Sequence, residues 1–498
     1  MTRTPLAAAL AVAALPALAA PPRAAADDEY YDLMKVFVDT FEQIDRNYVK
    51  DVDKRELVDA AVRGMLLELD PYSNYIPPDQ LADFTEDIEQ EFGGIGVQVN
   101  FDRRTKSLEV VAPLPGSPAF AVGLRTGDRI VEVNGESLAD FAAGQEQVEA
   151  LKRLRGPAGE PVEVGVVRPP AIQAATPGPD KPEAAENSDD EAETDADGGE
   201  KTDETSEQGA DGEQTEAAEA ADTDGDGKPD SLLRFQIVRE QIQLPTVFGY
   251  DRRAGGEWDY FLPLDGSDLK FGYVRLTSFT RRSAAEMKEA VSAIVDAGAD
   301  GLVLDLRDNP GGLLTAAVET VDLFLDSGLI VRTEGRNSQP RKWSASRSST
   351  FRDLPVAVLI NNYSASASEI TAAALQDHNR AVVIGTRSFG KGSVQNVIDL
   401  EGGSAALKLT TASYFRPSGK NIHRFPDAEE SDEWGVLPSD GYEVEMTPQQ
   451  MAKVREANRK AYQMSEERPE VDDDALERAI EVLSKEANAV KSTAAPAA

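Results

Sequence analysis

The stretch PVAVLINNYSASASEITAAAL, residues 355–375, passes from an apolar run through a turn into an alanine-rich segment. The run that begins at Pro355 is short and bounded by turn formers, which predicts a buried strand. Small, helix-forming residues follow from Ser366. This pattern exposes the Ser366 hydroxyl at the end of a sheet, near helix-start amides that can hold a developing oxyanion. The same residues are also typical of a helix cap, because Ser366 and Glu369 form a Ser-x-x-Glu capping box.

A serine nucleophile needs a proton acceptor, and the chain contains two histidines. His378 would lie about 18 Å from Ser366 along a continuous helix, which is too far. His423 lies in a loop rich in Gly and Pro and stays an alternative. Lys391, within GTRSFGKGSVQ (385–395), has small or apolar neighbours. Burial there can lower the pKa of a lysine enough for it to accept a proton at neutral pH, although a solvated surface lysine is the competing interpretation.

The segment from Gly385 to Lys391 also nearly matches a phosphate-binding loop. That motif requires Ser or Thr directly after the lysine, where this chain has Gly392. It also requires a helix next, whereas SVQNVIDL (393–400) alternates like a strand. We therefore expect no phosphate-binding loop at this position.

Four motifs together resemble the C-terminal processing (tail-specific) serine peptidases: SASASEI (364–370), FGKGSVQ (389–395), LVLDLRDNPGG (302–312) and LTTASYFRPSGK (409–420). The resemblance implies that Ser366 is the nucleophile, that Lys391 is the base and that Gln395 orients the lysine. It also implies an oxyanion hole made by the amides of Gly312 and Ala367. A peptidase domain over 245–447, with an α/β core of the ββα-repeat type, is expected on the same ground.

A second group of motifs resembles a PDZ domain, a strand-addition module for peptide C-termini: EFGGIGVQV (91–99), GSPAFAVGL (116–124), GDRIVEVNGESL (127–138) and LRGPAGEPVEVGVVR (154–168). We expect this domain to span 91–242. The amides of a turn formed by Gly93, Gly94, Ile95 and Gly96 should bind a terminal carboxylate, and the strand from Val97 should pair with the peptide. Glycines let the backbone approach such a ligand closely.

The length of 498 residues and the 41% hydrophobic content suit two or three domains. Residues 1–26 resemble a secretory signal, with the charge of Arg3 before an apolar, alanine-rich run. We expect a periplasmic or secreted protein, with an uncleaved membrane anchor as the alternative. The absence of cysteine and the scarcity of histidine leave a zinc or thiol mechanism without its usual ligands. No metal or cofactor is expected at the site.

The formal net charge of −38 is concentrated in one segment. Between Asp180 and Asp230 there are 21 acidic residues and 3 lysines, with almost no apolar residue larger than alanine. We predict a disordered insert over 169–231, at the tip of a hairpin within the PDZ domain. Such acidity argues against nucleic acid as a partner.

Within the insert, Asp222, Asp224 and Asp226 resemble the start of an EF-hand calcium loop. The bidentate acid expected at the twelfth position is missing, because Leu233 stands there. Weak calcium binding is therefore an alternative to a solvated acidic tract.

The two ends of the chain have helical patterns. Leu33, Phe37, Phe41 and Ile44 recur at helical spacing within 27–90, a segment that we predict to be a small helical domain. The family resemblance implies that such N-terminal helices help to form a homodimer or higher oligomer. Residues 448–498 are predicted to be a charged helical tail with a disordered end.

The sequence therefore predicts an α/β multidomain endopeptidase that acts on protein substrates with free C-termini. A PDZ-type binding adaptor on an inactive peptidase scaffold is the alternative. Loss of Ser366, Lys391 or Gln395 would have indicated such an adaptor, and all three residues are present.

Overall fold

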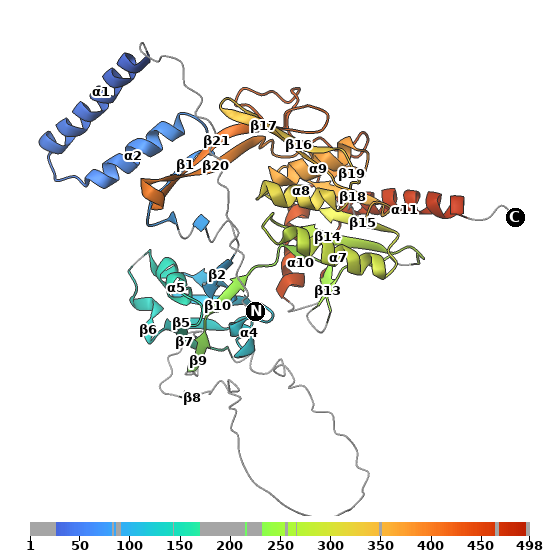
Figure 1. Ribbon diagram of the computed structural model, residues 1–498. Helices are drawn as coiled ribbons and strands as arrows, with labels where there is room; N and C mark the ends of the chain where they lie inside the picture. The colour runs from blue at the N-terminus through green and yellow to red at the C-terminus, as the bar shows by residue number, and fades with distance from the viewer. Residues whose placement is uncertain are drawn as a thin grey trace, which may run out of the picture.

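The computed structural model describes residues 26–81, 84–85, 91–142, 144–169, 215–216, 232–253, 257–264, 266–347, 351–463 and 468–494. The predicted signal segment before Ala26, nearly all of the acidic insert and its calcium-like motif lie outside these residues. The described chain forms a helical N-terminal segment, a β-rich PDZ domain and an α/β domain with C-terminal helices (Figure 1). The predicted fold class is thus confirmed.

The N-terminal segment consists of α1 (Ala26–Asn47) and α2 (Lys54–Leu67). The Asp53 side chain caps α2 by accepting the amides of its first turn. The chain then forms β1 (Asn74–Ile76), which pairs with the peptidase domain. The sequence did not indicate this strand.

The PDZ domain is built on a sheet in the order β3-β4-β5-β7-β9-β8, with β6 beside β5. Its strands are β3 (Val97–Asp102), β4 (Ser107–Pro113), β5 (Arg129–Val133), β6 (Glu136–Ser137), β7 (Pro161–Val167), β8 (Thr215–Glu216) and β9 (Leu232–Val238). Helices α4 (Pro118–Ala121) and α5 (Glu146–Leu154) pack on it. Because β3 stands at one end of this order, it is an edge strand whose outer backbone groups can pair with another chain.

The insert leaves and re-enters the PDZ domain through a hairpin, as predicted. Strand β7 pairs antiparallel with β9, from Pro161 opposite Val238 to Val167 opposite Leu232. This ladder fixes the strands on either side of the insert.

The peptidase domain contains a sheet in the order β11-β14-β15-β18-β19. Its strands are β11 (Val247–Phe248), β14 (Phe271–Leu276), β15 (Gly301–Asp305), β18 (Val356–Ile360) and β19 (Ala381–Gly385), all parallel except β11. Alternate residues face opposite sides of a strand. Val356 and Val358 pack against α7 (Ser283–Asp296), α8 (Leu314–Asp322) and α9 (Ala367–Asp377), whereas Ala357 and Leu359 pack against α11 (Asp474–Ala494). Helices thus cover both faces, which explains the unbroken apolar run before Ser366.

A second sheet, in the order β1-β21-β16-β17 with β20 beside β21, carries the lysine loop. It contains β16 (Leu329–Gly335), β17 (Ser338–Ser344), β20 (Ser393–Leu400) and β21 (Ala405–Phe415). The segment after Lys391 is therefore a strand, which confirms that this loop is not of the phosphate-binding type. Short pairs β12 (Asp251–Arg252) with β13 (Trp258–Asp259), and β2 (Glu91–Gly94) with β10 (Glu240–Gln243), complete the strands.

The C-terminal tail is helical, as predicted, and contains α10 (Pro448–Gln463) and α11. Helix α11 extends to Ala494, so the start of the STAAPAA end is helical rather than disordered, and residues 495–498 lie outside the described chain. Among the described residues, no helix is both long enough and apolar enough to span a membrane.

Candidate active site

The predicted nucleophile lies in the turn between β18 and α9. Ser366 has φ 54° and ψ −111° and is buried. A positive φ is unusual for a residue with a side chain and typically costs about 1–3 kcal/mol. Such strain persists only where surrounding contacts impose it.

The two serines that flank Ser366 bind the neighbouring loop rather than solvent. Ser364 donates its hydroxyl to the Leu306 carbonyl at 2.8 Å, and Ser368 donates to the Asn309 carbonyl at 2.9 Å. The amide of Ala365 also donates to the Asn309 carbonyl. Of the three serines in SASAS, the outer two therefore lock the turn onto the LDLRDN loop and leave the middle one for chemistry.

Glu369 holds the two predicted catalytic loops through one carboxylate. Its Oε2 accepts the amide of Ser366 at 2.7 Å and the amide of Lys391 at 2.8 Å. Its Oε1 accepts the Gly390 amide at 2.6 Å and the Ser388 hydroxyl at 2.5 Å. Burial raises the pKa of Glu369 to about 7, against the opposing effect of these donors. The Ser-x-x-Glu pattern is thus more than a helix cap, because the same carboxylate fixes the lysine loop.

Lys391 is largely shielded from solvent, and its ammonium lies 5.0 Å from the centre of the Tyr72 ring. Burial lowers the pKa of Lys391 from its ordinary value, and the charge of Lys408 lowers it further. The charges of Glu369 and Asp70 oppose this shift. A lysine in these surroundings can act as a base more readily than a solvated one.

Gln395, the predicted orienting residue, lies on β20. Gln395 donates its amide to Ser393 and to Thr410, and no hydrogen bond among the described residues links Gln395 to Lys391. Its predicted orienting role is therefore not seen in this conformation.

Neither histidine contacts Ser366 through a hydrogen bond in the described chain. His378 follows the far end of α9, as expected, and its ring contacts the Leu329 carbonyl. His423 packs its ring against Tyr72 and Phe425, and burial lowers its pKa.

The predicted oxyanion hole consists of two backbone amides, those of Gly312 and Ala367. The Gly311 amide donates to the Asn309 side chain, whereas the amides of Gly312 and Ala367 donate no hydrogen bond within the described chain. Gly311 lies so close to the nucleophile that an added Cβ would come within 2.8 Å of the Ser366 Cβ. The NPGG turn therefore packs directly against the serine, and two free donors remain beside it.

Sequence reasoning missed the residues that support these loops. Burial raises the pKa of Tyr414 to about 12, against an opposing effect of the Ser366 side chain. Arg307, fully buried, forms ion pairs with Asp305 and Asp473 at 2.7 Å each. Tyr414 and Arg307 both belong to motifs of the family resemblance, 409–420 and 302–312. Those motifs indicate that the two residues matter, but not which residues they contact.

The predicted carboxylate-binding turn of the PDZ domain needs a correction. Gly93 and Gly94 belong to strand β2 and pair with β10, so only Ile95 and Gly96 form the turn that leads to Val97. Gly93 is needed for a close approach, since an added Cβ would lie 2.0 Å from the Gly156 carbonyl oxygen. The amides of Ile95 and Gly96 donate no hydrogen bond within the described chain.

Comparison with known proteins agrees with this architecture. Residues 270–429 match Peptidase family S41, residues 109–168 match the PDZ domain and residues 17–79 match the N-terminal domain of the activating protease CtpB. The carboxy-terminal-processing protease of Bartonella bacilliformis is 34% identical over 397 residues, covering 79% of this chain and 73% of the relative. Carboxy-terminal processing protease CtpA of Bacillus subtilis is 30% identical, covering 77% of this chain and 65% of the relative. The solved photosystem II D1 C-terminal processing protease shares 25% identity with a TM-score of 0.39, covering 82% of this chain and 92% of that one.

The fold and motifs define a peptidase domain of the S41 type joined to a PDZ domain. The chain belongs to the family of carboxy-terminal processing proteases. The resemblance inferred from its motifs is thereby confirmed.

We predict that Glu369→Gln will lower kcat/KM by about 100-fold or more, because the new amide group opposes donors from both catalytic loops and a displacement of about 1 Å is enough for such a loss. The variant should also unfold at lower temperature, since buried donors left unpaired cost about 1–3 kcal/mol each. Peptidase kinetics and thermal unfolding measure the two effects. Glu319→Gln, on the exposed side of α8, is the matched control and should change neither. Unchanged kinetics in Glu369→Gln would contradict the bridging role.

Proposed function

We propose that this protein is an endopeptidase that captures the C-terminus of its substrate on the PDZ domain and cleaves with Ser366 and Lys391. The observation that carries the proposal is the shared carboxylate: Glu369 Oε2 accepts the amides of both residues. That arrangement holds the candidate nucleophile and base on adjoining loops. The lowered pKa of Lys391 supports its role as the proton acceptor.

In this mechanism the Ser366 hydroxyl attacks the scissile carbonyl while Lys391 accepts its proton. The amides of Gly312 and Ala367 stabilise the oxyanion of the tetrahedral intermediate. Lys391 then donates the proton to the leaving amine, which departs from a Ser366 ester. Water, deprotonated by the neutral lysine, hydrolyses that ester and regenerates the serine.

Recognition of the substrate would use the turn at Ile95 and Gly96 and the edge of β3. The two turn amides are free to bind a terminal carboxylate, and the strand that follows can pair with an extended peptide. We propose a periplasmic or secreted location, on the ground of the N-terminal segment 1–26, and fractionation of cells that express the full chain would test it.

Self-association through α1 is part of the proposal. This helix exposes large apolar side chains, including Tyr31, Leu33 and Val36. Exposed apolar surface of this extent is typical of a protein interface. Analytical ultracentrifugation of the protein with and without residues 27–52 would show whether a dimer depends on it.

We predict that Ser366→Ala and Lys391→Ala will each abolish turnover and that the double variant will be no worse, because the two residues act as a unit. Lys391→Arg should also be inactive, since the guanidinium remains protonated. Initial rates on an unfolded protein substrate measure all four variants. Full activity in Lys391→Ala would refute the proposed base and direct attention to His423; a PDZ adaptor without peptidase activity would show no turnover even in the unmodified protein.

The lowered pKa of Lys391 leads to a prediction about pH. Activity requires the neutral amine, so kcat/KM should rise with pH through the lysine pKa. Lys408→Gln removes a charge that lowers this pKa, so the rising limb of the profile should move to higher pH. Lys420→Gln, whose exposed ammonium pairs with Glu433, is the control and should leave the profile in place. A shift of the Lys408→Gln limb to lower pH would contradict the assignment.

Capture of the substrate carboxylate also makes a prediction. Amidation of a peptide C-terminus removes the charge that Ile95 and Gly96 would bind, and hydrogen bonds to charged groups contribute about 1.5–3 kcal/mol each. The dissociation constant should therefore rise at least about tenfold, as measured by fluorescence anisotropy with Ser366→Ala protein. Equal binding of the free acid and the amide would reject C-terminal recognition while leaving the peptidase mechanism intact.

A further inference from the structure

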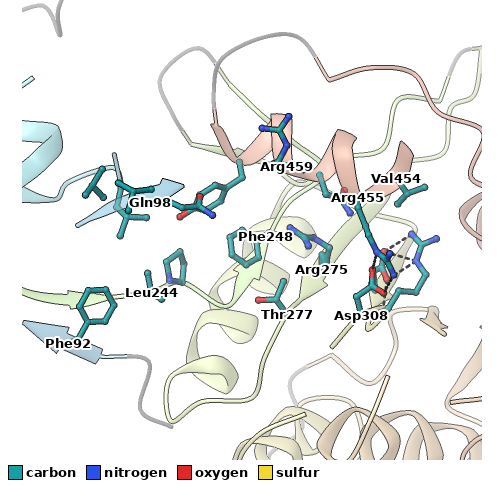
Figure 2. Close-up of a pocket in the computed structure, with 18 of the residues that line it drawn as sticks. Phe92, Gln98, Leu244, Phe248, Arg275, Thr277, Asp308, Val454, Arg455 and Arg459 are labelled. Atoms are coloured by element: carbon teal, nitrogen blue, oxygen red, sulfur yellow. Dashed lines mark hydrogen bonds and ion pairs between the residues drawn. The ribbon is translucent and has the colours of Figure 1, made fainter. Parts of the chain in front are cut away.

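A pocket of about 670 Å³ lies between the PDZ domain and the peptidase domain. Its PDZ wall includes Val97, Gln98 and Val99 of the edge strand β3. Its peptidase wall includes residues of β11, β14 and α10, together with the end of β15 and the loop that follows it. Figure 2 shows Gln98 on one side of the pocket, with Phe248, Arg275 and the helix that carries Arg455 and Arg459 on the other. The peptidase domain thus faces the strand edge at which a peptide would pair.

The alternation of side chains along β3 divides the pocket into two sides. Val97 and Val99 pack against the PDZ core, whereas Gln98 between them is exposed and lines the pocket. A peptide strand added beside β3 alternates in the same way. If its carboxylate is bound at Ile95 and Gly96, its last side chain lies on the apolar side with Val97 and Leu151, and its penultimate side chain lies on the side of Gln98, facing the peptidase domain.

The peptidase wall is basic. It contributes four arginines and two aspartates to the pocket, in a chain whose net charge is −38. Both aspartates are already paired: Asp305 with Arg307, and Asp308 with Arg455. The two aspartates of the wall therefore neutralise Arg307 and Arg455 and not its other arginines.

Among the described residues, Arg275 is the cation of this wall for which no carboxylate partner is found. It projects from β14, half-buried, with its guanidinium 5.1 Å from the centre of the Phe248 ring. No carboxylate within the described chain forms an ion pair with it, and Figure 2 shows it beside Phe248 and Thr277 with no interaction drawn to it. A half-buried guanidinium without a counter-charge favours an anionic ligand in the same pocket.

We propose that Arg275 is a specificity-determining residue that selects substrates with an acidic side chain at the penultimate position. The proposal rests on the proposed function, since it requires a C-terminus docked on β3. The recognition is shared between two domains: the PDZ domain binds the carboxylate and the last side chain, and the peptidase domain binds the side chain before it.

The test uses the full chain with Ser366→Ala, so that peptides are bound but not cleaved. Fluorescent peptides of one sequence ending in Ala-Asp-Val, Ala-Asn-Val or Ala-Lys-Val are titrated and followed by anisotropy. The Asp peptide should bind about tenfold more tightly than the Asn peptide, as expected for a charge-assisted hydrogen bond in a partly buried site, and the Lys peptide should bind more weakly still. Equal affinity for the three peptides would overturn the proposal. This comparison requires no variant of Arg275.

Variants then assign the effect to Arg275. Arg275→Gln should bind the Asp and Asn peptides equally, and Arg275→Glu should favour the Lys peptide. Arg336→Gln, an exposed arginine in the turn between β16 and β17, is the matched control and should keep the preference for Asp. A preference for Asp that survives in both Arg275 variants would reject the assignment.

The amidated Ala-Asp-Val peptide separates this inference from the proposed function. Loss of binding on amidation, together with no discrimination between Asp and Asn, would reject the role of Arg275 and keep C-terminal recognition. No effect of amidation would instead reject the recognition mode on which the inference rests.

Discussion

One buried carboxylate determines the geometry of the whole site. Ser366 lies in the turn after β18 of one sheet, and Lys391 lies in the loop between β19 of that sheet and β20 of the other. Glu369 accepts the amides of both residues on one oxygen, and the Gly390 amide and the Ser388 hydroxyl on the other. A buried carboxylate surrounded by donors tolerates little movement of either loop, because any shift of one loop leaves a buried donor unpaired. The relative position of the proposed nucleophile and base is therefore fixed by backbone contacts, independently of their side chains.

The LDLRDN loop extends this constraint to the C-terminal helices. Asn309 receives hydrogen bonds from the serine turn, while Arg307 pairs with Asp473 at the start of α11 and Asp308 pairs with Arg455 of α10. A single short loop thus contacts the catalytic turn on one side and both tail helices on the other. The same helix α10 forms part of the pocket opposite the PDZ edge strand. One loop thus connects the serine turn to a helix that lines the pocket.

Much of this arrangement could be predicted from the sequence, and the remainder has a physical explanation. The strand, turn and helix around Ser366, and the strand after Lys391, follow from local periodicity and small residues, which act over a few positions. Strand β1 could not be predicted, because three residues acquire their conformation only by pairing with β21. The role of Glu369 was seen only as local capping, since its partners Gly390 and Lys391 lie about twenty positions further along the chain. Gly93 and Gly94 were assigned to a turn on their composition, but pairing with β10 extends the strand through them. Arg275 belongs to none of the motifs. Its proposed role in specificity depends on which residues of the PDZ domain face it.

The backbone of Ser366 has a consequence for the evolution of this protein. With φ at 54° and ψ at −111°, this proposed nucleophile occupies a region of conformational space that suits glycine better than any residue with a side chain. Replacement by glycine would relieve the backbone strain but remove the hydroxyl. Selection for stability and selection for catalysis therefore oppose each other at this position. The dense packing around the turn, with Gly311 against it and two locked serines on its flanks, maintains that trade-off in favour of activity.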